Sequence, residues 1–101
     1  MADIPITREA TATGGRYVAL IGRRESEMTF AWVKSKGRKV MIVDHTGVPS
    51  ALSGQGVGLA LVKRAVEDAR AEGFRILPHC SFVRVMLVRH KEWQDVLASE
   101  A

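Results

Sequence analysis

The first half of the chain alternates short apolar runs with polar turns, as antiparallel strands do. The apolar runs occupy residues 16–21, 28–33 and 39–43, and turns rich in Gly, Ser and charged residues separate them. Runs of this length that hold Val, Ile and aromatic residues predict the strands of an antiparallel meander. Residues 1–14 show little pattern, and we expect them to be frayed or to form an edge strand.

The second half of the chain switches to a helical period. Leu61, Ala65 and Ala69 recur four positions apart, which gives the segment Val57–Glu72 one apolar helical face. Gly73 directly follows this segment and is placed to end the helix. The pattern therefore predicts one long helix that packs against the meander.

The remaining residues predict one more strand and two short helical segments. The strand covers residues 74–77, and the helical segments cover residues 82–90 and 92–98. A meander, a long helix, a further strand and terminal helices predict an α/β fold of the α+β type with a mixed sheet. The chain has 101 residues, 47% of them hydrophobic, so we expect a single domain over residues 1–101.

Residues 44–58 join the two halves and end in a turn that contains Gly54, Gly56 and Gly58. The turn leads directly into the helix, where bare N–H groups and the positive end of the helix dipole suit a phosphate. A mononucleotide P-loop needs Lys and then Ser or Thr after its last glycine, whereas Leu59 follows here. A dinucleotide fingerprint opens a parallel βαβ unit, whereas an antiparallel meander precedes this turn. The spacing alone leaves open both a phosphate-binding turn and a purely structural one.

Charge and composition narrow the classes of partner. The net charge is +4, but the 15 basic residues are mixed with 11 acidic ones, and clustering is confined to an expected hairpin tip with Lys34, Lys36, Arg38 and Lys39. Because few aromatic residues are available to stack on bases, this pattern disfavours nucleic-acid binding. No run approaches the roughly 18 apolar residues of a membrane helix, so we expect no membrane partner. The single cysteine fits a reducing compartment, and we expect a cytoplasmic protein.

Several short motifs follow one another in an order that is more specific than any one of them. They are His45-Thr46-Gly47-Val48-Pro49, Gly54-Gln55-Gly56-Val57-Gly58, Pro78-His79-Cys80-Ser81-Phe82-Val83 and His90-Lys91-Glu92-Trp93. This series resembles the GNAT (general N-acetyltransferase) superfamily, and within it the small single-domain branch often described as YjdJ-like. The resemblance covers residues 17–97.

The resemblance implies an acetyltransferase that uses acetyl-CoA, a form of coenzyme A, and an unidentified amine as acceptor. The strand that ends near Val48 would separate from its neighbour and offer backbone groups to the pantetheine arm. The turn over residues 53–58 would surround the pyrophosphate with amide donors, and its small residues would let the phosphate approach. Phe82 would flank the pantetheine. The implied binding residues are Thr46, Val48, Ser53, Gly54, Gln55, Gly56, Val57, Gly58 and Phe82.

The chain departs from this family pattern at four positions. Ser53 stands where the family usually has Arg, Lys or Gln, so one contact to phosphate is lost and weaker binding is expected. Ser81 and Lys91 replace prolines, and Met86 replaces a frequent Tyr that can donate a proton to the departing thiolate. Ser53 and Met86 favour, as an alternative function, a non-catalytic acyl-CoA-binding module.

Cys80 and His45 are the candidate catalytic residues, because the resemblance places both near the acyl group. A lone cysteine at the end of an apolar strand is most simply a small buried hydrophobe, whereas a nucleophilic Cys80 needs a lowered pKa. The start of the following helix or a neighbouring imidazole could lower it. His45, across the sheet, is a better candidate for that imidazole than His79, because adjacent side chains on a strand point to opposite faces.

His45 could also accept the proton of an amine, or could only fix the strand–loop junction by hydrogen bonds. Glu27 is a second candidate base if its side chain faces the cleft, and otherwise a solvated polar residue. We expect direct acyl transfer to the amine, with transfer through Cys80 as the variant. Three histidines and one cysteine without metal-like spacing predict no metal site.

Overall fold

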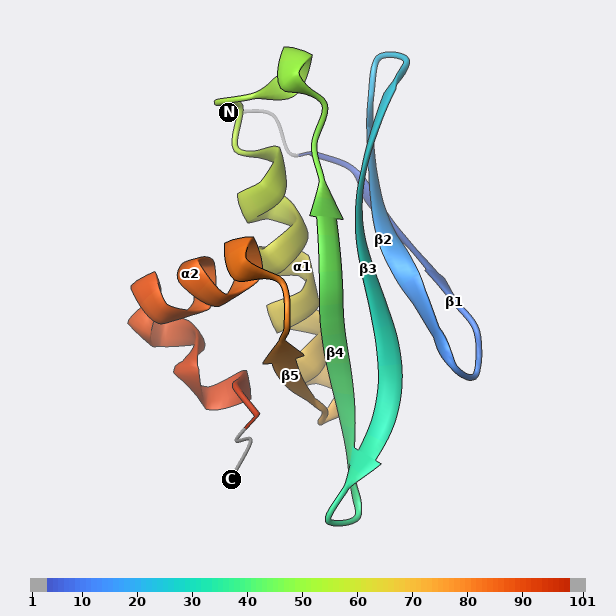
Figure 1. Cartoon of the computed structure of the whole chain (residues 1–101), viewed down its shortest axis with the longest axis vertical. Helices are drawn as coiled ribbons and strands as arrows, with labels where there is room; N and C mark the ends of the chain where they lie inside the picture. Colours follow the sequence, from blue (N-terminus) through green and yellow to red (C-terminus); the bar gives the residue numbers. More distant parts are fainter. Residues whose placement is uncertain (1–3, 99–101) are drawn as a thin grey trace.

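The computed structural model describes residues 4–98, which form a five-stranded sheet in the order β1-β2-β3-β4-β5 (Figure 1). The first four strands make an antiparallel meander, and β5 lies parallel to β4. The mixed sheet that the sequence predicts is therefore confirmed. The strands are β1 (Ile6–Ala10), β2 (Gly14–Ile21), β3 (Arg24–Ser35), β4 (Arg38–Gly47) and β5 (Arg75–Pro78).

The long helix α1 (Val57–Glu72) connects β4 to β5 and has the bounds that the sequence predicts. It begins after Gly56, whose φ of 78° is left-handed, and ends at Gly73, whose φ is 79°. The N–H of Gly73 donates to the carbonyl of Ala69 at 2.8 Å, as expected for a glycine that ends a helix. Helix α2 (Ser81–Arg89) follows β5, and the short 3₁₀ helices are η1 (Ser50–Leu52) and η2 (Lys91–Val96).

One face of the sheet packs against the helices and forms the hydrophobic core. On the sheet side, the core consists of alternate residues of β2, β3 and β4, among them Tyr17, Met28, Phe30, Met41 and Val43. The helices contribute Val57, Leu61, Val62, Ala65, Val66, Ala69, Val83, Leu87, Trp93 and Val96. Because strand side chains alternate between faces, the intervening residues of β2 and β3 lie on the opposite face, where several of them are charged.

The observed strands are longer than the apolar runs predict. β3 has 12 residues and β4 has 10, because polar residues beyond the apolar runs, on both faces of the sheet, keep their pairing with the neighbouring strands. Within residues 1–14, the segment Ile6–Ala10 forms the edge strand β1, so the edge-strand alternative is confirmed there. Residues 1–3 lie outside the described residues.

The last expected helical segment, over residues 92–98, is confirmed as helical, but its bounds differ. The chain forms the 3₁₀ helix η2, and Leu97 then pairs in parallel with Ile76 of β5. The N–H of Ala98 donates to the carbonyl of Ile76 at 2.8 Å. This hydrogen bond to the free edge of β5 replaces a further helical turn.

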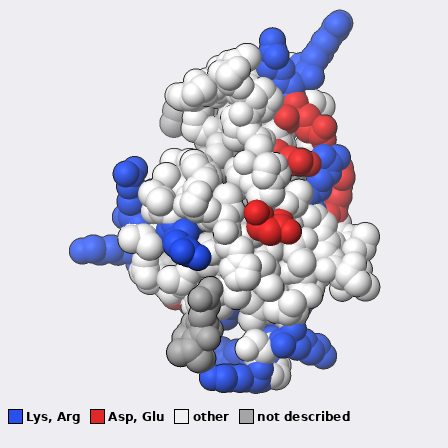
Figure 2. Space-filling view, in the orientation of Figure 1, with Lys and Arg blue, Asp and Glu red and all other residues white. Residues whose placement is uncertain are grey.

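Basic side chains gather at the β3–β4 hairpin, as the sequence predicts (Figure 2). The hairpin turns through Lys36 and Gly37, both of which have a positive φ. Next to it, the Lys39 ammonium lies 3.8 Å from the centre of the Trp32 ring. Among residues 4–98, no helix is long and apolar enough to cross a membrane.

Candidate functional site

Strands β4 and β5 separate partway along β4. Their parallel pairing ends at Val43 and Pro78. The backbone N–H groups of His79 and Cys80, which follow β5, both donate to the Val43 carbonyl, at 2.9 and 3.0 Å. Beyond this point the chain of β5 turns into α2, whereas β4 continues to Gly47 and stays paired with β3 on its other side. Among the described strands, β4 therefore has no partner on its β5 side beyond Val43. The two strands separate here, as predicted for the strand that ends near Val48.

A β-bulge near the end of β4 determines which of its side chains lie on each face of the sheet. The register between β3 and β4 shifts at Asp44, which is left unpaired, and His45 then pairs with Thr29. Directly paired side chains share a face, so His45 lies with Thr29 on the face away from the helices. The next residue, Thr46, pairs with the core residue Met28 and lies on the helix side.

Cys80 lies on the helix side of the strand end, next to Thr46. Its sulfur is 3.5 Å from the Thr46 Oγ1, and Cys80 is the N-cap residue of α2. Burial acts to raise the pKa of the Cys80 thiol, but the Thr46 hydroxyl and the backbone amides at the start of α2 outweigh burial and lower it. The expected effect of the helix start is therefore present. The expected imidazole neighbour is not: the bulge puts Thr46 where strict alternation would put His45.

The glycine turn presents the first amides of α1. Gly54 and Gly56 have φ values of 80° and 78°, and an added Cβ would meet nothing within 4 Å at either position, so the backbone conformation is what requires glycine. The first backbone hydrogen bond of α1 runs from the Ala60 N–H to the Gly56 carbonyl at 3.0 Å. A helix offers no acceptor of its own to its first four amides, those of residues 56–59. With the helix dipole, they make this end of α1 suitable for an anion.

Gly58 lies against a side chain of α2, a contact that the sequence did not predict. An added Cβ would lie 2.6 Å from the Phe82 Cζ, so the absence of a side chain at Gly58 lets the Phe82 ring lie against the first turn of α1. The Phe82 side chain is also 38% exposed, which leaves part of the ring surface open to a ligand. The structure thus shows a constraint at Gly58 that arises from the contact between α1 and α2.

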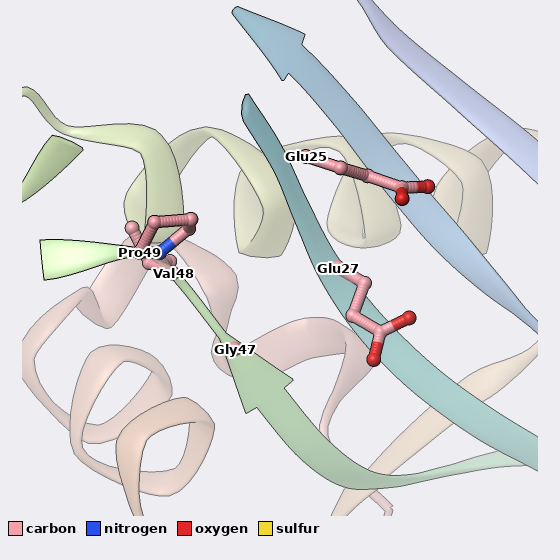
Figure 3. Close-up of a pocket in the computed structure, with 5 residues that line it drawn as sticks. All are labelled: Glu25, Glu27, Gly47, Val48 and Pro49. Carbon is pink, nitrogen blue, oxygen red and sulfur yellow. The ribbon is translucent and has the colours of Figure 1, made fainter. Parts of the chain in front are cut away.

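A shallow cavity of about 410 Å³, widely open to solvent, lies on the face away from the helices, beside the end of β4 (Figure 3). Its lining residues come from β3 and from the segment that leaves β4: Glu25, Glu27, Gly47, Val48 and Pro49. The His45 Nε2 lies 3.2 Å from the position that a Cβ of Gly47 would take, so the imidazole stands beside this cavity. Glu27, the second candidate base, is one of the lining residues.

Arg16 holds the carboxylates that lie near this cavity. Its guanidinium contacts Glu27 at 2.9 Å, Glu25 at 3.0 Å and Glu9 at 2.9 Å. These carboxylates, with the Glu27 hydrogen bond first, raise the pKa of Arg16 further above its ordinary value. A single guanidinium therefore forms ion pairs with three carboxylates on this face.

The structure gives Met86 a packing role. Its side chain is half-buried and packs against the core, and its carbonyl accepts a hydrogen bond from the N–H of His90 at 3.1 Å. His90 stacks on Trp93 with the ring centres 4.1 Å apart, so it belongs to the packing of η2. Among residues 4–98, no group of three or more His, Cys, Asp or Glu side chains is placed to hold a metal ion.

Sequence reasoning missed two features of this site. Thr46 was expected to act through its backbone, whereas its hydroxyl also contacts Cys80. Glu25 was not singled out, although Glu25 and Glu27 are two positions apart on β3 and therefore share a face. That spacing is the sequence signal that points to the acidic lining of the cavity.

Comparisons with known proteins identify the class to which this fold and site belong. The sequence profile of a family described as GCN5-related N-acetyl-transferase matches residues 16–96. A GCN5-like protein from Staphylococcus aureus, solved by NMR, is similar in structure with a TM-score of 0.71 and 30% identity, over 100% of this chain and 94% of that one. The ribosomal-protein-alanine N-acetyltransferase of Brucella melitensis biovar Abortus 2308 shares the fold with a TM-score of 0.65 and 17% identity, over 90% of this chain and 66% of that one.

The chain therefore belongs to the GCN5-related N-acetyltransferase family, which confirms the GNAT resemblance. Acetyltransferases of this family take their acetyl group from acetyl-CoA and pass it to an acceptor.

Proposed function

We propose that this protein transfers an acetyl group from acetyl-CoA to an amine at the end of β4, in the separation between β4 and β5. The observation that carries the proposal is the arrangement of this strand end. The anion-binding start of α1 and the Cys80 thiol lie on the helix side, whereas His45 and an acidic cavity lie on the other side. A donor and an acceptor can thus approach the same short stretch of backbone from two sides.

The donor is held by the glycine turn and by the free edge of β4. The amides of residues 56–58 and the dipole of α1 bind the pyrophosphate. Backbone groups of Thr46 and Val48 hold the pantetheine arm, and the exposed part of the Phe82 ring covers it. Ser53 and Gln55 are exposed at the entrance of the turn, and neither side chain carries a charge, so the phosphate contacts come from the backbone. Binding is therefore weaker than in relatives with Arg or Lys at position 53.

The acetyl group passes directly from sulfur to nitrogen. The neutral amine nitrogen forms a C–N bond to the thioester carbonyl carbon, the C–S bond breaks, and the sulfur leaves as a thiolate. Backbone N–H groups of β4 polarise the carbonyl oxygen, and His45 or a water beside it accepts the proton that the amine loses. The thiolate takes its proton from water, because Met86 cannot donate one.

Thiol release from acetyl-CoA in the presence of a primary amine tests this proposal. We expect release that depends on both the protein and the amine, and a loss of at least about tenfold in kcat/KM for His45→Ala. His79 is an exposed histidine between β5 and α2, so His79→Ala is the matched control. We expect this variant to keep the wild-type rate. No amine-dependent thiol release, although coenzyme A binds, would favour the non-catalytic acyl-CoA-binding module.

Cys80 offers the one specific alternative, in which the acetyl group first moves to its sulfur. The lowered pKa of the thiol and its position at the start of α2 favour this route. Cys80→Ser separates the two routes. Direct transfer predicts a modest loss of rate and no acetylated intermediate in intact-mass spectra. Transfer through Cys80 predicts that activity collapses in the variant and that the wild-type protein gains the mass of one acetyl group before amine is added.

A further inference from the structure

We propose that the cavity beside the end of β4 is the acceptor site and that it selects a small amine with a second positive charge, such as a diamine. This inference rests on the proposed acetyl transfer. It names the class of acceptor, which neither the fold nor the family membership specifies. The residues that determine this specificity are Glu25 and Glu27.

The position of the cavity fits an acceptor. Gly47 and Val48 line it, and both belong to the strand end on whose other side Cys80 lies. His45 stands over Gly47 at the rim of the cavity. An amine bound here would therefore have a proton acceptor beside it and would reach the acyl carbon from the side opposite the donor.

The charge on the lining fits a cation. Glu25 and Glu27 are the charged lining residues, and 47% and 35% of their side chains are exposed. Their partner Arg16 is shared with Glu9, so the four charges sum to two negative. Arg24 does not offset this charge, because alternation along β3 directs its side chain to the other face. Figure 3 shows both carboxylates on one side of Gly47, with Val48 and Pro49 on the other.

The size of the cavity and the spacing of the carboxylates favour a small diamine. A volume of about 410 Å³ is at the lower end of the range of small-molecule sites. Glu27 pairs with Gly47, beside which the His45 Nε2 lies, and Glu25 is two residues, or about 7 Å, farther along β3. An extended chain of a few carbons can therefore place its reacting amine beside the His45 Nε2 at Gly47 and its second ammonium against Glu25. Val48 and Pro49 supply an apolar wall for the carbons between the two amines.

Steady-state kinetics with two amines that have the same four-carbon chain test the inference. Diaminobutane, with an amine at each end, and butylamine differ by one ammonium group. We expect a lower KM for diaminobutane, and we expect Glu25→Gln to raise that KM about threefold to fivefold while the KM for butylamine stays unchanged. Glu9→Gln is the matched control, because Glu9 shares Arg16 but does not line the cavity.

Binding of diaminobutane without acetyl-CoA separates this inference from the proposed function. Amide NMR shifts at Gly47 and Val48 that weaken in Glu25→Gln would support the acceptor site even if no acetyl transfer occurs. Equal KM values for both amines in the wild-type protein, or equal effects of Glu25→Gln and Glu9→Gln, would overturn the inference while leaving the proposed function intact. Turnover with a lysine-containing peptide and with neither small amine would also overturn it.

Discussion

The contact between Thr46 and Cys80 should increase the reactivity of the Cys80 thiol, and alkylation kinetics can measure this effect. A hydroxyl 3.5 Å from the sulfur can donate to the thiolate, and this interaction lowers the pKa of Cys80. Thr46→Val removes the hydroxyl and keeps the shape, so the pKa of Cys80 rises and less thiolate is present at neutral pH. We expect iodoacetamide to alkylate Cys80 several times more slowly at neutral pH and the rate profile to move to higher pH.

Thr29→Val is the control for this prediction, because Thr29 pairs with His45 on the other face of the sheet. Its alkylation profile should match that of the wild-type protein. An unchanged profile in Thr46→Val would mean that the start of α2 alone sets the reactivity of Cys80.

Tyr17 links the stability of the fold to alkaline pH. Its hydroxyl donates to the Asp68 carboxylate at 2.8 Å, and Arg8 and Arg64 contact the same carboxylate. Burial raises the pKa of Tyr17 above its ordinary value of 10.0; the Asp68 hydrogen bond adds to this effect and Arg8 opposes it. Because the pKa is higher in the folded state, the contribution of Tyr17 to stability is full below about pH 10 and is lost as the pH rises above it.

We therefore expect the difference in unfolding free energy between the wild-type protein and Tyr17→Phe to shrink as the pH rises from about 9 to about 11. At neutral pH the difference should be about 1 kcal/mol, the usual value of one hydrogen bond. Urea unfolding at several pH values measures it. Because the chain has a single tyrosine, phenolate absorbance of the native protein reports the same pKa directly. A constant difference across this range would contradict the account.

Helix α1 and the strands show where the sequence suffices and where it does not. The helix has its predicted bounds, because the glycines at 56 and 73 mark both ends with a left-handed backbone. Strands β3 and β4 were predicted too short, since polar residues beyond the apolar runs still pair with the neighbouring strands. The bulge at Asp44 has no sequence signal at all, because it is a property of how β4 pairs with β3.

That bulge explains the main difference between the expected and the observed site. Without it, alternation from the core residue Val43 would direct His45 toward the helices and Cys80. With it, Thr46 takes that place and His45 moves to the acidic cavity. The residue types and their order were therefore predictable from the sequence, whereas the division of the site into two sides required the structure.

The edge strand β1 depends on a close approach between β1 and β2. A Cβ at Gly15 would lie 2.1 Å from the Glu9 carbonyl oxygen, which is backbone and cannot move without shifting the strand. We expect Gly15→Ala to destabilise the fold by about 2 kcal/mol or more in urea unfolding, with loss of amide protection in β1. Gly37→Ala is the control: its φ is 79° but nothing lies within 4 Å, so backbone strain of about 1 kcal/mol is the expected cost. Equal effects of the two variants would contradict the predicted clash.

In the molecule as a whole, the basic hairpin lies far along the sheet from the expected anion site. The hairpin with Lys34, Lys36, Arg38 and Lys39 lies at one end of the β3–β4 pair, and the segment that leads from β4 into the glycine turn begins at the other (Figure 1). A polyanion such as coenzyme A could also be attracted to the hairpin by charge alone. A test of the acyl-CoA site must therefore show which residues contact coenzyme A, and not only that coenzyme A binds.

An amide NMR titration of the isotope-labelled protein with coenzyme A locates it most directly. We predict that the amides with the largest shifts are those of Gly56, Val57 and Gly58, followed by those of Thr46 and Val48, and that the hairpin over residues 34–39 shifts little. No shifts at millimolar coenzyme A, or shifts confined to residues 34–39, would contradict an acyl-CoA site at the end of β4.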